Sequence, residues 1–260
     1  MIRKLTEQDH EQTYAFLKQE PSFNLFLIGD IEAFGYDQEF QELWGLFGED
    51  DSLQAVLLRY HTSFIPYTVG EFDVTTFSKQ LQNYDHVILS GKTKIVEQFE
   101  NVEGIKLGNR RDMYFCECLN ADYIKNEENK SVQLATLEDV DRIMELRAQI
   151  QEFRAAPQAK EMLKQAIETK TGRTYYIEID GVIVSSASTA AENSQSAMVV
   201  GVCTHPDYRG HSYASLILEQ IIRDITAEGK TLCLFYDNPA AGRIYKRLGF
   251  QDIGMWTMYR

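Results

Sequence analysis

The feature that most restricts the fold is an internal repeat. Residues 2–9, IRKLTEQD, and residues 132–139, VQLATLED, are alike and lie half a chain length apart in a sequence of 260 residues. Each combines an alternating run typical of a strand with Thr-x-x-Asp before an apolar helical stripe. Thr6 and Thr136 suit helix N-caps, and the aspartate three positions later adds negative charge to the first turn. The chain is therefore predicted to contain two copies of one α/β unit.

Both copies continue from the helix into a hairpin pattern. Residues 42–60 and residues 173–190 each place acidic and turn-forming residues between two strand-like runs. Residues 121–131, ADYIKNEENKS, form the most polar stretch of the chain and are predicted to be the linker. We accordingly expect one domain at residues 1–125 and a second domain at residues 126–260.

The second copy then alternates strands with helices. The pattern predicts strands at residues 197–204, 231–236 and 252–259, and helices at residues 212–228 and 239–248. Gly229 and Gly249 stand where the two helices should end, because glycine is the usual residue just after a helix. This order predicts an α/β fold with a mixed sheet flanked by helices.

The loop before the first of these helices has the properties of an anion site. Residues 205–212 join a predicted strand to a predicted helix, whose first backbone N–H groups lack partners and carry partial positive charge. Arg209 adds a fixed positive charge, and no Asp or Glu occurs from Arg209 to Leu218. Small residues in the same stretch let backbone amides approach a pyrophosphate closely.

Two segments carry a family resemblance. Residues 200–214, VGVCTHPDYRGHSYA, resemble the Arg/Gln-x-x-Gly-x-Gly/Ala signature of the GNAT N-acetyltransferase superfamily, whose loop amides hold the pyrophosphate of acetyl-CoA. Arg209 and Ala214 fit the pattern, whereas Ser212 stands where the family usually has glycine and should disfavour positive φ. Residues 235–250, FYDNPAAGRIYKRLGF, resemble the family's closing strand, its Asn-x-x-Ala helix and its Tyr-x-x-x-Gly-Phe end.

The resemblance implies two GNAT-like acyl-CoA N-acyltransferase domains in tandem, with acetyl-CoA as co-substrate and no metal. It implies that Tyr245 is the general acid that reprotonates the leaving thiolate. The cofactor-binding residues that it implies are Val202, Cys203, Thr204, Arg209, Gly210, His211, Ser212, Tyr213, Ala214, Ser215, Asn238 and Ala241. From the residues alone, Tyr245 also fits a core aromatic, and Asn238 before Pro239 also fits a helix N-cap.

The first copy lacks both motifs. Residues 86–104 offer a strand and a helix, but no Arg-x-x-Gly-x-Gly/Ala loop. The resemblance therefore implies a degenerate GNAT-like domain without a cofactor motif at residues 1–125, with activity confined to the second copy. The aromatic-rich residues 23–36 could line an acceptor pocket, but a helix packed on the partner domain is the favoured interpretation.

The expected reaction is direct attack of a primary amine on the thioester, with a strand N–H near Val202 holding the oxyanion. The general base stays unassigned: Glu178, Glu192 and Asp237 are the nearby carboxylates, and proton removal through water is equally compatible. A CoA-binding sensor without catalysis is the main alternative, and a structural protein without a ligand is a third.

The net charge and its distribution limit the classes of partner that the chain can bind. The formal net charge of −13 argues against nucleic acid, because binding phosphates needs a surplus of Lys and Arg. Residues 1–130 hold 12 Lys+Arg against 23 Asp+Glu, whereas residues 131–260 hold 14 against 16. A nearly neutral half can hold an anionic ligand, and an acidic half favours a cationic small-molecule acceptor.

The remaining patterns exclude other classes. No window approaches the roughly 20 apolar residues of a membrane span, so a cytoplasmic protein is expected. The four cysteines form neither a disulfide framework nor a CxxC metal motif, and Cys116 and Cys118 should face the same side of one strand. SGKTK at residues 90–94 is no P-loop, since His86 occupies the required glycine position. The oligomeric state stays open, and two domains packed together are compatible with a monomer.

Overall fold

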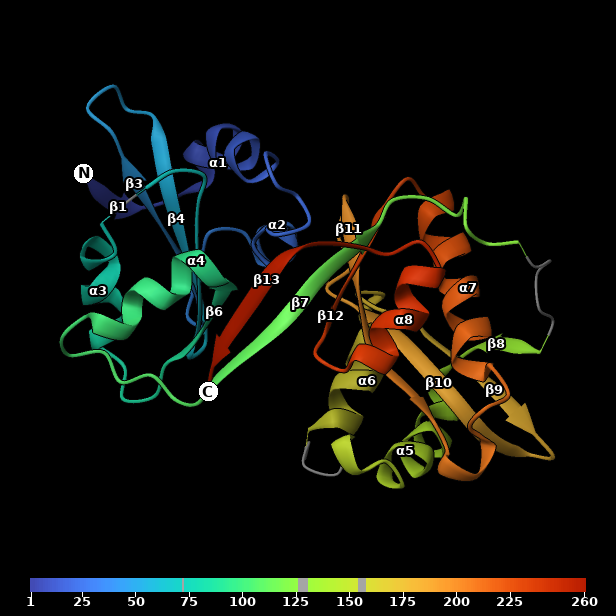
Figure 1. The fold of residues 1–260 in the computed structure, drawn as a ribbon. Coiled ribbons are helices and arrows are strands. Elements are labelled where there is room, and N and C mark those ends of the chain that lie inside the picture. Colours follow the sequence, from blue (N-terminus) through green and yellow to red (C-terminus); the bar gives the residue numbers. More distant parts are fainter. Residues whose placement is uncertain (72, 126–130, 154–157) are drawn as a thin grey trace. The chain divides into compact units, whose positions relative to one another are not determined.

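The computed structural model describes residues 1–71, 73–125, 131–153 and 158–260, and the chain divides into two compact units. The first unit comprises Met1–Phe115, Phe235–Asp237 and Asp252–Arg260, and the second comprises Cys116–Leu234 and Asn238–Gln251. Neither unit is one continuous segment: the last strand of the chain belongs to the first unit, and Phe235–Asp237, also of the first unit, interrupt the second (Figure 1). The expected domain boundary adjoins residues 126–130, which lie outside the described residues.

The first unit is built on a mixed sheet with the strand order β1-β3-β4-β5-β6-β13-β7, and β2 pairs with β3. The pairing is antiparallel from β1 to β5, parallel between β5 and β6, and antiparallel again between β6 and β13. Its strands are β1 (Ile2–Lys4), β2 (Asp37–Gln38), β3 (Gln41–Phe47), β4 (Leu53–Tyr60), β5 (Ser63–Thr68), β6 (Ile88–Lys92), the first part of β7 (Arg110–Cys118) and nearly all of β13 (Gln251–Tyr259). Its helices are η1 (Glu7–Asp9), α1 (His10–Leu17), α2 (Leu25–Phe34), α3 (Thr75–Gln82), α4 (Thr93–Val96) and η2 (Glu97–Asn101).

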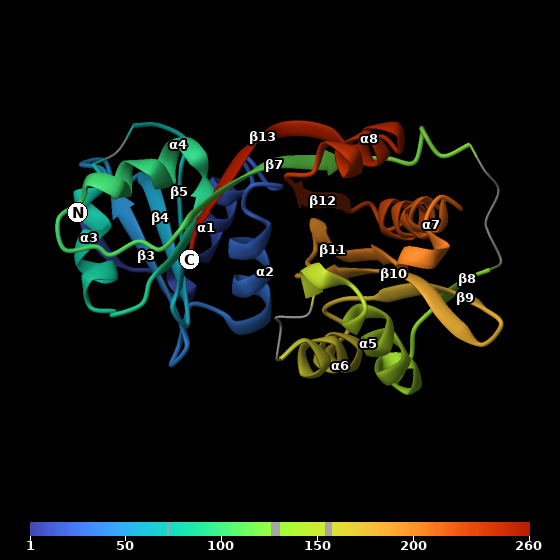
Figure 2. The ribbon, with the colours of Figure 1, turned by 60° about the horizontal axis from the view of Figure 1, so that its bottom comes forward.

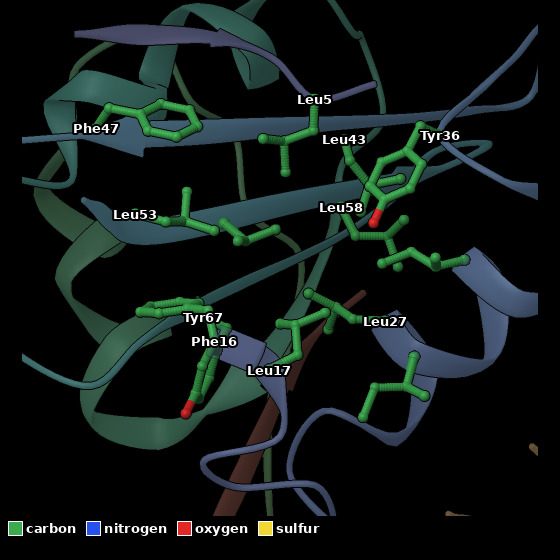
Figure 3. Packing of buried hydrophobic residues seen from close by; sticks show 13 residues of the cluster. Leu5, Phe16, Leu17, Leu27, Tyr36, Leu43, Phe47, Leu53, Leu58 and Tyr67 are labelled. Carbon is green, nitrogen blue, oxygen red and sulfur yellow. The ribbon is translucent and has the colours of Figure 1, made fainter. Parts of the chain in front are cut away.

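Alternation along β4 explains why this sheet has helices on both faces. Val56 and Leu58 join the cluster that includes α1 and α2, whereas Ala55 and Leu57 join the cluster that includes α3 and α4. Figure 3 shows the first of these clusters, which contains leucines of β3 and β4 and the aromatic side chains of Phe16, Tyr36 and Tyr67. The aromatic-rich residues 23–36 contain helix α2, which buries four aliphatic side chains in this unit. A helix in this stretch is confirmed, whereas its packing on the partner domain stays a prediction.

The second unit has the strand order β12-β11-β10-β9-β8. Its helices lie on both faces of the sheet: α5 and α6 pack against Tyr176, Ile183 and Cys203, and α7 packs on the other face (Figure 2). Its strands are β8 (Val132–Leu134), β9 (Thr174–Ile179), β10 (Val182–Ala190), β11 (Ser196–Thr204) and most of β12 (Thr231–Tyr236). Its helices are η3 (Leu137–Asp139), α5 (Val140–Ala148), η4 (Gln151–Phe153), α6 (Ala159–Thr169), η5 (Pro206–Tyr208), α7 (Tyr213–Ala227) and α8 (Pro239–Arg247).

The repeat predicted from the sequence is confirmed at its caps. Thr6 and Thr136 are the N-caps of η1 and η3, and each forms a capping box with the aspartate three residues later. The predicted hairpins are β3 with β4 and β9 with β10. All four cysteines are buried, and none of them forms a disulfide. In the described parts of the chain, no helix combines the length and apolar character needed to cross a membrane.

Candidate functional site

Strand β11 leaves its neighbour β12 early. The two strands pair in parallel over three positions, from Ser196 with Thr231 to Met198 with Cys233. Beyond Met198, no pairing of β11 with β12 is found among the described residues, whereas the pairing with β10 continues to Thr204. The carboxyl half of β11 is therefore bonded on one side only, which leaves backbone groups on its other side for a ligand.

A bulge interrupts β11 in this one-sided stretch. Ser188 pairs with Val200 and Ser186 pairs with Cys203, so Gly201 and Val202 together face a single residue of β10. Gly201 has φ +64°, a conformation that glycine adopts easily. A Cβ on Gly201 would lie only 2.9 Å from Arg147 Nη2. Bulges re-aim backbone groups, and this one changes the direction of the strand beside Val202.

Gly201 was missed as a site residue by the sequence reasoning. The available signal was a glycine inside a β-branched strand pattern, V-V-G-V, which indicates a bulge or a close backbone approach.

The loop after β11 is held by its own side chains. His205 caps η5, because its Nδ1 accepts from the N–H of Asp207, and its Nε2 lies 2.6 Å from Gln149 Oε1. Arg209 is exposed, and its Nε donates to the carbonyl of Thr204 at 3.3 Å. Gly210 has φ +86° and open space where a Cβ would be. The loop therefore presents a cation beside an uncrowded backbone.

Ser212 takes the conformation that a serine was expected to avoid. It is the N-cap of α7 with φ +62° and ψ 14°, in the left-handed region, and its side chain makes no capping hydrogen bond. The structure thus places the backbone turn at Ser212 where the GNAT signature has glycine. A residue with a Cβ in this conformation carries local strain.

The first turn of α7 is tied to α8. Ser215 is 5% exposed, and its Oγ accepts from Arg247 Nη2 at 2.9 Å. The bond brings the guanidinium of Arg247 to the start of α7, where partial positive charge is already present. His211 stacks on Tyr213 with ring centroids 5.5 Å apart, and Ala214 is half-buried. Positive charge therefore gathers at the N-terminus of α7.

Helix α8 begins at a polar N-cap and carries a half-buried tyrosine. Asn238 is its N-cap and accepts from the N–H of Ala240 at 2.8 Å, with Pro239 following, so the predicted capping role is confirmed. Ala241 is half-buried. Tyr245 is half-buried beside Phe250, and burial raises the pKa of Tyr245 to about 12. The hydroxyl consequently stays protonated at neutral pH and can donate.

The side chains at the end of β11 are occupied within the sheet. Cys203 is buried with its sulfur 3.5 Å from Ser186 Oγ, and the hydroxyl of Thr204 lies 2.9 Å from Ser185 Oγ. A ligand at β11 would therefore meet the backbone of these two residues rather than their side chains.

The three carboxylates considered as general bases are all engaged in ion pairs. Glu178 pairs with Arg142, Glu192 with Arg173 at 3.0 Å, and Asp237, within the first unit, with Arg111 at 2.6 Å. The geometry therefore singles out none of them.

The loop and the helix that it enters fit the pyrophosphate of CoA in chemistry: backbone amides at a helix start, two arginines nearby and no intervening carboxylate. Residues 140–250 match the model of the acetyltransferase (GNAT) family. The second unit carries a GNAT-family domain. The match begins at α5 and ends at Phe250, so it includes the bulge, the loop, α7 and α8. The family resemblance predicted from the two motifs is confirmed, and the first unit's degenerate character stays a prediction.

Solved structures with this GNAT fold cover the whole chain. A GCN5-related N-acetyltransferase from Sphaerobacter thermophilus has a TM-score of 0.63 at 14% identity, covering 100% of this chain and 94% of its own. A GCN5-related N-acetyltransferase-like protein from Streptococcus suis has a TM-score of 0.60 at 14% identity, covering 98% and 99%. A tandem GNAT protein from the clavulanic acid biosynthesis pathway has a TM-score of 0.60 at 14% identity, covering 100% and 97%.

At such identities the likeness shows the fold alone, which is the two-domain GNAT fold expected from the repeat. No curated protein matches the chain by sequence.

Proposed function

We propose that the second unit transfers an acetyl group from acetyl-CoA to a primary amine. The observation that carries this proposal is the bulge at Gly201 and Val202, on the one-sided stretch of β11 that leads directly into the loop and α7. A backbone N–H that a bulge turns out of the sheet can stabilise the negative charge that develops on a carbonyl oxygen. A helix N-terminus can bind a pyrophosphate. Both groups belong to one continuous segment.

The proposed roles follow from this arrangement. Acetyl-CoA supplies the activated carbonyl as a thioester. The N–H groups from Gly210 to Ala214, with Arg209, would hold its pyrophosphate, and Asn238 and Ala241 would line its pantetheine arm. The N–H near Val202 would accept the developing oxyanion. Tyr245 would donate its proton towards the departing sulfur, since its hydroxyl is protonated at neutral pH.

The proposal also includes a cationic acceptor and a cytoplasmic location. The acidic composition of residues 1–130 favours an acceptor whose amine is protonated in solution. Water is the proposed route for its deprotonation, because Glu178, Glu192 and Asp237 are all ion-paired. The lack of disulfides among the four cysteines suits a reducing compartment, and we place the activity in the cytoplasm.

The ion-paired carboxylates also favour one alternative, a CoA-binding sensor without turnover. Titration calorimetry with acetyl-CoA, followed by a free-thiol release assay over a panel of amines, separates the two. Binding with amine-dependent thiol release supports the enzyme, binding without release on any amine supports the sensor, and no binding refutes both.

The bulge is tested by Gly201→Ala against Gly181→Ala. Both glycines have positive φ, but a Cβ on Gly181 would meet open space, whereas one on Gly201 would meet Arg147. Losing an aligned oxyanion donor lowers kcat by about 100-fold or more, so we expect that loss for Gly201→Ala and near wild-type kcat for Gly181→Ala. Equal kcat values for the two variants would refute the role of the bulge.

A further inference from the structure

Arg147 is a charged side chain that the proposed reaction leaves unused. It lies in the last turn of α5, on the face of the sheet that α5 and α6 cover, and it is half-buried. Its Nη2 is 2.9 Å from the position where Gly201 would carry a Cβ. The guanidinium therefore rests directly against the bulge, where the acyl group is proposed to react.

This guanidinium has no acidic partner within ion-pair distance in the described part of the chain. Nη2 donates to Ser188 Oγ at 2.8 Å, and Nε is buried without an acceptor among the described residues. Burial lowers the pKa of Arg147, although an arginine stays charged at neutral pH. A half-buried cation held only by a hydroxyl is costly, since buried charges are normally paired.

Two other arginines of the same unit form ion pairs. Arg173 forms ion pairs with Glu192 at 3.0 Å and Glu228 at 2.7 Å, and Arg142 pairs with Asp139 at 3.3 Å. Among the described residues, Cys203 is the ionisable group that acts electrostatically on Arg147. It is no counter-ion, because burial raises the pKa of its thiol and keeps the thiol neutral. Arg209 and Arg247 also have no ion pair among the described residues, but both are exposed, whereas Arg147 is half-buried and its Nε has no acceptor there.

We propose that Arg147 binds a carboxylate of the substrate beside the bulge, so that the acceptor is an amino-acid-like molecule with both an amine and a carboxylate. The inference rests on the proposed acetyl transfer and deepens it by naming the substrate class. A planar guanidinium with free N–H groups matches a carboxylate in shape and charge. The same chemistry would serve a carboxylate on the acyl group of the donor, so the test includes both sources.

The test measures kcat/KM by thiol release for the twenty amino acids and their carboxamides with acetyl-CoA, and for simple amines with acetyl-CoA and succinyl-CoA. A charge-assisted hydrogen bond lost on a buried group costs about 10- to 100-fold. We expect at least one amino acid to exceed its carboxamide by that factor. Arg147→Gln should abolish the difference through the KM of the amino acid, whereas Lys164→Gln, which removes an exposed charge from α6, should preserve it.

A second readout does not depend on turnover. Calorimetric titration of the matching N-acetyl amino acid into the wild-type protein with CoA should show binding that Arg147→Gln weakens by a similar factor. If the carboxamides react as fast as the amino acids, the assignment of a carboxylate on the acceptor is overturned, while acetyl transfer itself still stands. A preference for succinyl-CoA lost in Arg147→Gln would place the carboxylate on the donor instead and overturn the acceptor assignment. No thiol release with any amine refutes acetyl transfer and this inference together.

Discussion

Replacing Ser212 with glycine tests how the loop before α7 is held. Ser212 has φ +62° and makes no capping hydrogen bond, so its side chain contributes strain without a compensating contact at the cap. A left-handed conformation costs a residue with a Cβ about 1–2 kcal/mol. Glycine removes this cost but also loosens the unfolded chain, which offsets about 0.4–1 kcal/mol. Ser212→Gly should therefore stabilise the second unit by about 1 kcal/mol.

Ser212→Ala is the matched control, because alanine keeps the Cβ and the strain while it removes the hydroxyl. It should leave the stability of the unit within about 0.5 kcal/mol of wild type. Far-UV circular dichroism during urea unfolding is the suitable assay, since Trp44 and Trp256 both belong to the first unit and their fluorescence would not follow the second. Two results would refute the reasoning: a glycine variant less stable than wild type, or an alanine variant stabilised as much as the glycine variant.

Three further changes have defined outcomes. Tyr245→Phe should lower kcat for thiol release by about 100-fold with unchanged acetyl-CoA binding in calorimetry, because a general acid contributes about that factor; full turnover would remove Tyr245 from the mechanism. Glu228 has its pKa lowered to about 2 by Arg173, so its contribution to stability is present above about pH 4.5 and is lost as the pH falls towards 2; Glu228→Gln should lack this acid-induced loss in thermal unfolding. Burial raises the pKa of Asp30 to about 7. The free energy of unfolding of the first unit should therefore fall as the pH rises from about 4 through 7, by up to about 4 kcal/mol. Asp30→Asn should flatten this pH dependence in tryptophan-monitored unfolding.

The local features of the fold could be predicted because their causes are local. Thr6 and Thr136 cap their helices through bonds to residues at most three positions away, and such contacts can be inferred from spacing alone. Asn238 before Pro239 is predictable for the same reason. The proposed anion site is also local, because a strand, a loop and a helix start follow one another in the sequence.

The features that escaped prediction depend on distant neighbours. Residues 252–259 were correctly expected to form a strand, but their pairing with β6 depends on a segment far away in the sequence. Arg147 resembles any basic residue in the last turn of a helix, and its missing counter-ion becomes visible only when Gly201 is brought against it. Ser212 also differed from expectation: it adopts a positive φ that serine normally disfavours, because the loop geometry requires it.

Strand β13 gives the protein a particular order of folding. It lies between β6 and β7 in the sheet of the first unit, where Trp256 and Tyr259 are buried, yet the ribosome makes it after nearly all of the second unit. Chains emerge at about 5–20 residues per second, so the first unit waits several seconds with β6 exposing an unpaired edge. Translation thus leaves the first unit unfinished while the GNAT-family domain is already being assembled, and chaperones that cover strand edges would meet the nascent chain in that interval.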